Sequence, residues 1–259
     1  MAYTGETYGD ATADVYDDLY DGFTPPAAQI ERLKKLAGTG PAVEVGSGTG
    51  RIAIPLALAG VAVTAVDASE EMTSRLAKKI GGLPITPVKA DAADYVHPTR
   101  IDLLFAVFNT FFLLADEPVQ RAFLRNAARA LTPDGTLVLE TFVPRPGPQR
   151  LPDGPHPGVF PEGTALVLKR EFADGVHLFA AERQADKQEF HYREVILRDG
   201  CPVRVLPGKM RYWTPEDIDD LAKDAGLVLK ERHADWSGTP YDSAHSHKHI
   251  SAYRLAPTT

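Results

Sequence analysis

The sequence predicts an α/β fold with one doubly wound, mostly parallel sheet of seven strands and an inserted antiparallel β segment. Two observations predict it. Short apolar runs alternate with amphipathic stretches over the first 142 residues, and a glycine cluster follows the first of those runs. After residue 142 this pattern gives way to alternating strands bounded by turn residues. The strands of the first part therefore pair in parallel through helical crossovers.

The first strands and helices alternate in order along the chain. Residues 27–36 carry apolar side chains at helical spacing, and residues 41–45 form a short buried run that ends at the glycine cluster. Residues 51–59 predict the next helix, which ends at Gly60. The continuous apolar run 61–66 is then the second buried strand.

The alternation continues with a third helix. Ser69 is its expected N-cap, and Glu70 and Glu71 follow in the first turn, where the helix dipole favours anions. Residues 85–89 and 101–108 predict two further strands, both parallel and buried.

The remaining strands of the main sheet come from both halves of the chain. Residues 119–131 carry a helical apolar stripe, and the turn 132–135 leads into a strand at 136–142. Residues 227–232 and 249–255 supply two last strands. The predicted sheet thereby reaches seven strands.

A different pattern fills the segment 143–212. Seven prolines lie between residues 144 and 161, so we expect a loop without regular structure there. Four alternating runs then predict antiparallel hairpins, at residues 165–172, 176–183, 190–197 and 203–212. Because no flexible linker separates the parts, we expect a single domain over 1–259, with 143–212 as a cap over the substrate.

Composition and charge exclude several classes of protein. The 259 residues include 28 basic and 35 acidic side chains, a net charge of −7, which disfavours a nucleic-acid partner. The single cysteine, Cys201, excludes an intramolecular disulfide and a multi-cysteine zinc site. No apolar stretch is long enough to cross a membrane, and the acidic N-terminus lacks the features of a signal peptide. We therefore expect a cytoplasmic protein without a membrane partner.

No metal site is expected. His245, His247 and His249 would lie on one side of an extended strand, which is a possible metal-binding arrangement. Lys248 and Arg254 nearby indicate a solvated strand edge instead.

The strongest functional signal is the run Glu44-Val-Gly-Ser-Gly-Thr-Gly-Arg51, which follows a strand and opens a helix. Glycines let the backbone pass close to a ligand, and a helix N-terminus favours a negatively charged group. The spacing G-x-G-x-G differs from the G-x-G-x-x-G of dinucleotide-binding loops. This spacing disfavours NAD or FAD, and an NAD-dependent oxidoreductase stays as an alternative, as does a glycine turn that serves packing only.

This run resembles the first motif of class I S-adenosylmethionine-dependent methyltransferases. The resemblance spans roughly residues 1–142 and returns at 210–255. It implies a Rossmann-like fold with S-adenosylmethionine as cofactor. It also implies that Asp67 binds the ribose hydroxyls and that Asp91 and Ala92 meet the adenine.

Two further parts of the chain resemble members that act on small molecules. Tyr8, Tyr16 and Tyr20 resemble an N-terminal segment that covers the cofactor, so residues 1–22 are expected to form a lid. The runs 109–114 and 238–241 resemble bacterial N-methyltransferases that modify peptide N-termini or amino sugars. The implied acceptor is a small natural product or a short peptide, methylated at nitrogen.

The candidate cofactor-binding residues combine the motif with physical arguments. The Asp67 carboxylate can accept hydrogen bonds from both ribose hydroxyls. The Met72 thioether suits an adenine face, although core packing explains it nearly as well. The full set is Tyr8, Tyr16, Tyr20, Glu44, Gly46, Ser47, Gly48, Gly50, Arg51, Asp67, Ala68, Met72, Asp91, Ala92 and Phe108.

The acceptor is expected beyond the fourth strand, because ligands gather at the carboxyl ends of strands in open α/β sheets. Asn109 would face it, and Phe111 and Phe112 would wall its pocket, although core packing is an alternative for both rings. Tyr16 and His191 are the candidate catalytic residues. His191 is a titratable imidazole of the inserted segment and could act as a general base, whereas an exposed strand histidine is the common alternative.

These observations together predict a methyltransferase that holds the methyl donor and a nucleophile in line within a dry pocket. An NAD-dependent oxidoreductase and a non-catalytic S-adenosylmethionine-binding scaffold are the two alternatives. A homodimer is possible.

Overall fold

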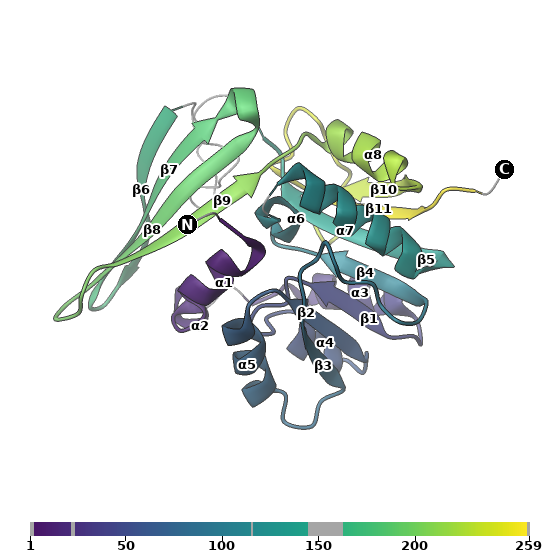
Figure 1. Ribbon diagram of the computed structural model, residues 1–259, viewed down its shortest axis with the longest axis horizontal. Coiled ribbons are helices and arrows are strands. Elements are labelled where there is room, and N and C mark those ends of the chain that lie inside the picture. Colours follow the sequence, from purple (N-terminus) through teal and green to yellow (C-terminus); the bar gives the residue numbers. More distant parts are fainter. Residues whose placement is uncertain (1–2, 22–23, 115, 145–162, 258–259) are drawn as a thin grey trace.

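The computed structural model describes residues 3–21, 24–114, 116–144 and 163–257, which form two sheets with helices around the larger one (Figure 1). The larger sheet has seven strands in the order β10-β11-β5-β4-β1-β2-β3, and the smaller has four in the order β6-β7-β8-β9. Figure 1 shows the smaller sheet beside the main body, with α1 and α2 lying between the two.

Five strands of the larger sheet pair in parallel: β1 (Ala42–Val45), β2 (Val63–Asp67), β3 (Ile85–Lys89), β4 (Ile101–Ala106) and β5 (Leu131–Phe142). The sheet continues with β11 (Lys248–Leu255), antiparallel to both of its neighbours, and β10 (Leu227–His233). This confirms the predicted doubly wound, mostly parallel sheet of seven strands. The strand order reverses between β1 and β4, where open α/β sheets bind ligands.

Helices cover both faces of this sheet. The helices α3 (Ala27–Ala37), α4 (Ala53–Leu58) and α5 (Glu70–Lys79) contribute buried residues to one core cluster, and α6 (Thr110–Leu113), α7 (Glu117–Ala130) and α8 (Pro215–Asp224) to the other. Ser69 caps α5 as predicted, since its hydroxyl accepts from the Met72 amide at 3.1 Å. The Thr214 hydroxyl accepts likewise from the Asp217 amide at the start of α8.

The strand β3 lies at the sheet edge, which corrects one expectation. Ile85 is buried, but Thr86 and Lys89 are exposed. The short apolar run predicted a buried strand inside the sheet. Among the described strands, however, β3 pairs only with β2, so its outer edge is exposed.

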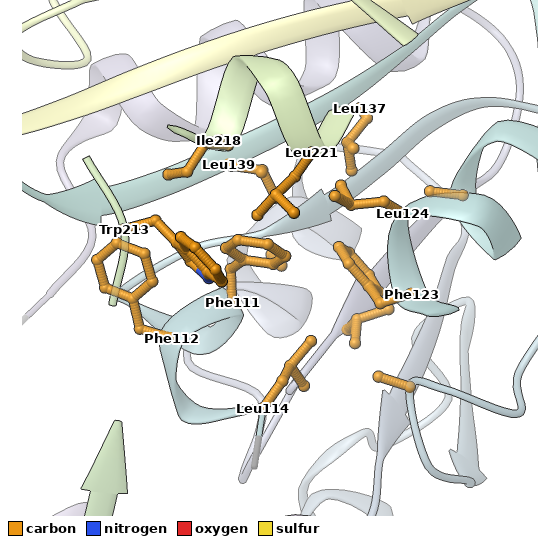
Figure 2. Close-up of a cluster of buried hydrophobic side chains, with 14 of the residues drawn as sticks. Phe111, Phe112, Leu114, Phe123, Leu124, Leu137, Leu139, Trp213, Ile218 and Leu221 are labelled. Carbon is orange, nitrogen blue, oxygen red and sulfur yellow. The ribbon is translucent and has the colours of Figure 1, made fainter. Parts of the chain in front are cut away.

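A second correction concerns Phe111 and Phe112, which were expected to wall the acceptor pocket. Both rings have no exposed area and belong to the hydrophobic core (Figure 2). The Phe111 ring centroid lies 5.9 Å from that of Phe123 on α7, and the Phe112 centroid lies 4.9 Å from that of Phe142 on β5. These rings anchor α6 to the sheet because edge and tilted contacts between aromatic rings add to the free energy of burial.

The smaller sheet is formed by β6 (Gly163–Phe172), β7 (Gly175–Gln184), β8 (Glu189–Arg198) and β9 (Arg204–Arg211). Each neighbouring pair is antiparallel, so the predicted hairpins are confirmed. One face is buried and aromatic, with Phe179 and Tyr192 stacked at 5.0 Å between ring centroids. The proline-rich loop predicted at 144–161 lies, apart from Pro144, outside the described residues.

Two short N-terminal helices complete the described chain, α1 (Gly5–Thr12) and α2 (Tyr16–Leu19). The Ser69 hydroxyl donates to Asp10 on α1 at 2.6 Å, and Lys79 pairs with Asp17 on α2 at 2.5 Å. Arg204 of β9 pairs with Asp14. The N-terminal segment is thereby held to both the main body and the smaller sheet.

Candidate active site

A cavity of about 680 Å³ lies where the larger sheet, the N-terminal helices and the smaller sheet meet. Its lining includes fourteen of the fifteen predicted cofactor-binding residues: Tyr8, Tyr16, Tyr20, Glu44, Gly46, Ser47, Gly48, Arg51, Asp67, Ala68, Met72, Asp91, Ala92 and Phe108. The fold thus brings together residues from β1, β2, the loop after β3, the end of β4 and the N-terminus. Further lining residues come from the smaller sheet.

The glycine loop after β1 forms one wall of the cavity. Gly46 has a φ of +72°, and a Cβ there would lie 2.3 Å from Thr110 Cγ2. Gly48 has a φ of +53°, and a Cβ there would meet only Met72 Sδ, at 3.9 Å. The backbone at Gly48 therefore borders open space, which a side chain would enter from a strained conformation.

Asp67 ends β2 and points its carboxylate into the same corner. Oδ2 accepts from the Gly48 amide at 2.8 Å, and Oδ1 accepts from the Ser69 amide at 2.9 Å. Burial raises the pKa of Asp67, although these two bonds oppose the rise. Each oxygen retains a lone pair, so the oriented carboxylate can accept two further hydrogen bonds from a diol.

Glu44 lies beneath the glycine loop and is buried. Its Oε2 has no hydrogen-bond partner among the described residues, and the same holds for Ser47 Oγ. Burial raises the pKa of Glu44 to about 8. A buried acceptor without a partner costs free energy, so the site favours a ligand that brings a donor or a positive charge.

Three tyrosines from the N-terminal segment line the cavity. The hydroxyls of Tyr8 and Tyr20 lie 3.2 Å apart, and the rings of Tyr16 and Tyr20 lie 4.6 Å apart. Burial raises the pKa of Tyr16 and of Tyr20, so both hydroxyls keep their protons at neutral pH. They can donate hydrogen bonds but are poor bases.

The end of β4 adopts an unusual backbone conformation. Phe108 and Asn109 have φ values of +57° and +67°, in the left-handed region that bulky residues rarely enter. The turn places the Phe108 ring in the cavity wall, 4.2 Å from Arg51 Cζ and 5.6 Å from the Tyr20 centroid. Asn109 lines the cavity, but its Oδ1 accepts from the Phe142 amide at 2.8 Å. Its side chain therefore holds β4 to β5.

The smaller sheet supplies residues that the sequence argument missed. Lys169, Phe179, Glu194 and Met210 line the cavity, as does Tyr192. Glu194 is the unexpected one, because it follows Phe190 and Tyr192 at alternate positions on the buried face of β8. The sequence signal that could have identified Glu194 is a single acidic residue in a run of alternating apolar residues.

Glu194 is buried and held by two basic side chains. Its Oε2 lies 2.8 Å from His177 Nε2, and its Oε1 accepts from Lys169 Nζ at 3.4 Å. Burial favours the neutral acid, but His177 and Lys169 outweigh it and hold the pKa of Glu194 below its ordinary value. Glu194 is therefore ionised at neutral pH.

Besides Phe111 and Phe112 of the core, two predicted site residues lie away from the cavity. His191 occupies the opposite face of β8 from Tyr192 and Glu194, and its Nε2 pairs with Glu189 Oε2 at 2.7 Å. The structure therefore does not bring His191 to the cavity, where a general base would act, because a strand presents successive side chains to opposite faces. Gly50 instead permits close packing, because a Cβ there would lie 2.4 Å from Leu76 Cδ1.

The C-terminal histidines do not form a metal site in the part of the chain that the structure describes, which holds no group of three potential ligands. His249 is buried between the hydroxyls of Thr141 and Ser251, each at 2.8 Å. Burial lowers its pKa to about 3, so this imidazole is neutral at neutral pH.

Comparisons with known proteins agree with this geometry. Residues 42–135 match the methyltransferase domain family. Over 238 residues the sequence is 26% identical to the cypemycin N-terminal methyltransferase of a Streptomyces species, covering 90% of this chain and 92% of that protein. The CcbJ methyltransferase from Streptomyces caelestis is 33% identical with a TM-score of 0.86, covering 98% of this chain and 100% of that one.

A more distant structure shares the fold. An S-adenosylmethionine-dependent methyltransferase from Clostridium acetobutylicum has a TM-score of 0.74 at 13% identity, covering 96% of this chain and 99% of that one.

No helix among the described residues is both long and apolar enough to cross a membrane.

Proposed function

The chain belongs to the class I S-adenosylmethionine-dependent methyltransferases, and on this premise we propose that it methylates an amine nitrogen of a small natural product or a short peptide. One observation carries the proposal. A single cavity joins a glycine wall at the strand ends to an aromatic wall on the smaller sheet. Donor and acceptor can therefore meet inside one enclosed space.

The glycine wall fits S-adenosylmethionine. The open space beside Gly48 admits a ligand at van der Waals distance from the backbone, and the partnerless oxygen of Glu44 suits a cationic group. When bound, this cofactor supplies an electrophilic methyl group on a positively charged sulfur. Asp67 would hold the ribose hydroxyls and Asp91 the adenine amino group, with Met72 against the adenine ring.

The chain's own contribution is to position the reactants and to exclude water. Tyr8, Tyr16 and Tyr20 would cover the cavity, and the Phe108 ring would confine the reacting groups on the side of β4. Because its hydroxyl keeps its proton, Tyr16 would donate a hydrogen bond rather than accept the acceptor's proton. We propose the segment 1–22 as a lid and the segment 143–212 as the substrate cap of a single domain.

Nitrogen is the proposed target because of two observations. The curated relative is named for methylation of a peptide N-terminus. The acceptor side of the cavity also combines aromatic rings with an ionised carboxylate, a combination that suits an amine. We further propose a cytoplasmic enzyme without a nucleic-acid partner, supported by one cysteine and a net charge of −7.

The experiment uses S-adenosylmethionine with an isotopically labelled methyl group and a set of amine acceptors. The set contains a short peptide with a free N-terminus, an amino sugar and a cyclic secondary amine, each beside its N-acetylated form. Mass spectrometry should show one labelled methyl group on the nitrogen of at least one free amine and none on the acetylated forms. Transfer to oxygen or carbon, or no transfer to any amine, would overturn the proposal.

A non-catalytic scaffold is the remaining alternative. It would bind S-adenosylhomocysteine, measured by calorimetry, but transfer no label to any acceptor in a producing-strain extract. Family membership decides against the NAD-dependent oxidoreductase.

A further inference from the structure

Glu194 differs from the three other acidic residues that line the cavity. Glu44, Asp67 and Asp91 lie at or just after the ends of β1, β2 and β3, where the cofactor is expected. Glu194 comes from the middle of β8, on the smaller sheet. Among the described lining residues, it is the acidic side chain of the acceptor wall.

The cost of burying this carboxylate indicates a function. An ion removed from water costs several kcal/mol unless good partners compensate. His177 Nε2 lies 2.8 Å from Oε2, within ion-pair distance, although neither atom makes a well-oriented hydrogen bond among the described residues. Lys169 Nζ lies 3.4 Å from Oε1, longer than the 2.7–2.9 Å typical of charge-assisted hydrogen bonds. The hydroxyl of Tyr20 also interacts with the Glu194 carboxylate, and Tyr8 and Tyr192 are the other titratable groups that face it.

The surroundings of Oε1 already accommodate a cationic amine, that of Lys169. Its Nζ lies 5.0 Å from the Tyr20 ring centroid and 5.5 Å from the Phe179 centroid. Aromatic faces attract ammonium groups, more strongly where water is excluded. The wall therefore offers a second ammonium group the same combination of rings and carboxylate.

We propose that Glu194 binds the amine of the acceptor as an ammonium ion and accepts its proton, while His177 is a positioning residue that orients the carboxylate. This assignment rests on the proposed methylation of nitrogen. The N–H bond breaks and the proton passes to a Glu194 oxygen. The freed nitrogen lone pair then forms the bond to the methyl carbon, whose bond to sulfur breaks with its electron pair left on sulfur.

The assignment predicts a specific pH dependence. With Glu194 in place the enzyme uses the ammonium form together with the ionised carboxylate, so kcat/KM is flat with pH between the pKa of Glu194 and that of the amine. Glu194→Gln can use only the neutral amine in solution, so its kcat/KM rises about tenfold per pH unit over the same range. If Glu194 had a purely structural role, the profile of Glu194→Gln would lie below that of the wild type by a constant factor and run parallel to it.

The test measures kcat/KM against pH for the best amine acceptor identified by methyl labelling. Glu194→Gln should lose about 100-fold near neutral pH and recover most of that loss two units higher. Glu194→Asp, which keeps the charge, should be slower but keep the flat profile. Glu182→Gln is the matched control, since Glu182 is an exposed residue of β7, and it should behave as the wild type.

Two controls separate the possible failures. Unchanged affinity for S-adenosylhomocysteine shows that a variant is folded with an intact cofactor site. In the wild type, the inhibition constant of the alcohol analogue of the acceptor should be at least about 30-fold higher than the dissociation constant of the amine. This comparison needs no variant. A parallel pH profile for Glu194→Gln, or equal binding of amine and alcohol, would overturn this assignment alone. A wild-type enzyme that methylates no amine would overturn the proposed function and this assignment with it.

Discussion

The two walls of the cavity are constructed from different parts of the chain and in different ways. The wall at the strand ends consists of consecutive residues, such as Glu44 to Gly48, whose backbone groups and carboxylates line the cavity. The wall on the smaller sheet consists of alternate side chains from paired strands, such as Phe179 on β7 and Glu194 on β8, which are register partners. The first wall depends on local backbone geometry, and the second depends on strand register.

This difference predicts that the two walls have separate functions. Changes in the first wall should alter cofactor affinity, and changes in the second should alter acceptor use. Substitutions in each wall and in the hydrophobic core test these separate functions, from the largest expected effect to the smallest.

Phe111→Ala tests whether α6 belongs to the core or to the acceptor wall. Truncating a fully buried phenylalanine should lower the free energy of unfolding by about 3–5 kcal/mol, measured by urea denaturation, and leave cofactor affinity unchanged. Leu58→Ala is the control, because Leu58 is exposed and should cost little. Normal stability of Phe111→Ala together with a raised KM for the acceptor would show that Phe111 lines the acceptor wall.

Glu44→Gln tests the buried carboxyl of the first wall through pH. The folded chain has a Glu44 pKa of about 8, against an ordinary value of 4.5, so folding favours the protonated acid. The wild type therefore loses stability relative to the variant as pH rises from about 4.5 to about 8, by an amount on the order of 4 kcal/mol. Denaturation of the ligand-free chains at both pH values measures the difference.

The exposed Glu31 provides the control for that experiment. Glu31→Gln should track the wild type across the whole range. If Glu44→Gln also tracks the wild type, Glu44 is not buried in the way the structure describes.

Gly48→Val tests the opening through which the cofactor is expected to reach the backbone. The β-branched side chain would enter the cavity and strain a positive φ, so S-adenosylhomocysteine affinity should fall by at least about 100-fold, as calorimetry can measure. Gly60→Val shares the strain, with a φ of +95° and no neighbouring atom within 4 Å, but lies away from the cavity. It should lower stability and keep affinity. Retained binding by Gly48→Val would refute the loop as the cofactor site.

Asp67→Ala tests the expected ribose contact. Loss of a charged acceptor should weaken cofactor binding by about 2–3 kcal/mol. Asp220→Ala, an exposed substitution on α8, is the control and should leave the dissociation constant unchanged. An unchanged constant for Asp67→Ala would place the ribose elsewhere.

His191→Gln should have the smallest effect. Its side chain is 38% exposed and lies on the face of β8 that points away from the cavity. We expect turnover within about twofold of the wild type, since exposed substitutions rarely cost more than about 0.5 kcal/mol. A large loss of turnover with normal cofactor affinity would restore His191 as a catalytic residue.

The sequence predicted the first wall in detail because its signals are local. The glycine run directly follows a buried strand, and Asp67 directly ends the next one. Such short-range patterns constrain both the strand and the position of the loop at its end. Gly50 was the exception, since only the packed structure shows Leu76 against it.

The second wall was predicted poorly because its geometry depends on distant pairings. His177 faces Glu194 only through the register of β7 and β8, and Lys169 reaches it from β6. The argument from residue type favoured His191, whereas the alternation of β8 places its imidazole on the other face. Likewise, Phe111 and Phe112 followed a strand end, but α6 turns both rings into the core (Figure 2).

A crystal structure of the full chain with S-adenosylhomocysteine would test the division of the cavity most directly. The account predicts the ligand against Gly48, with its ribose hydroxyls on Asp67 and its adenine beside Asp91. It also predicts that the space between Phe179 and Glu194 stays accessible to an acceptor. A ligand that contacts Glu194 and leaves Asp67 without a ribose contact would contradict the account.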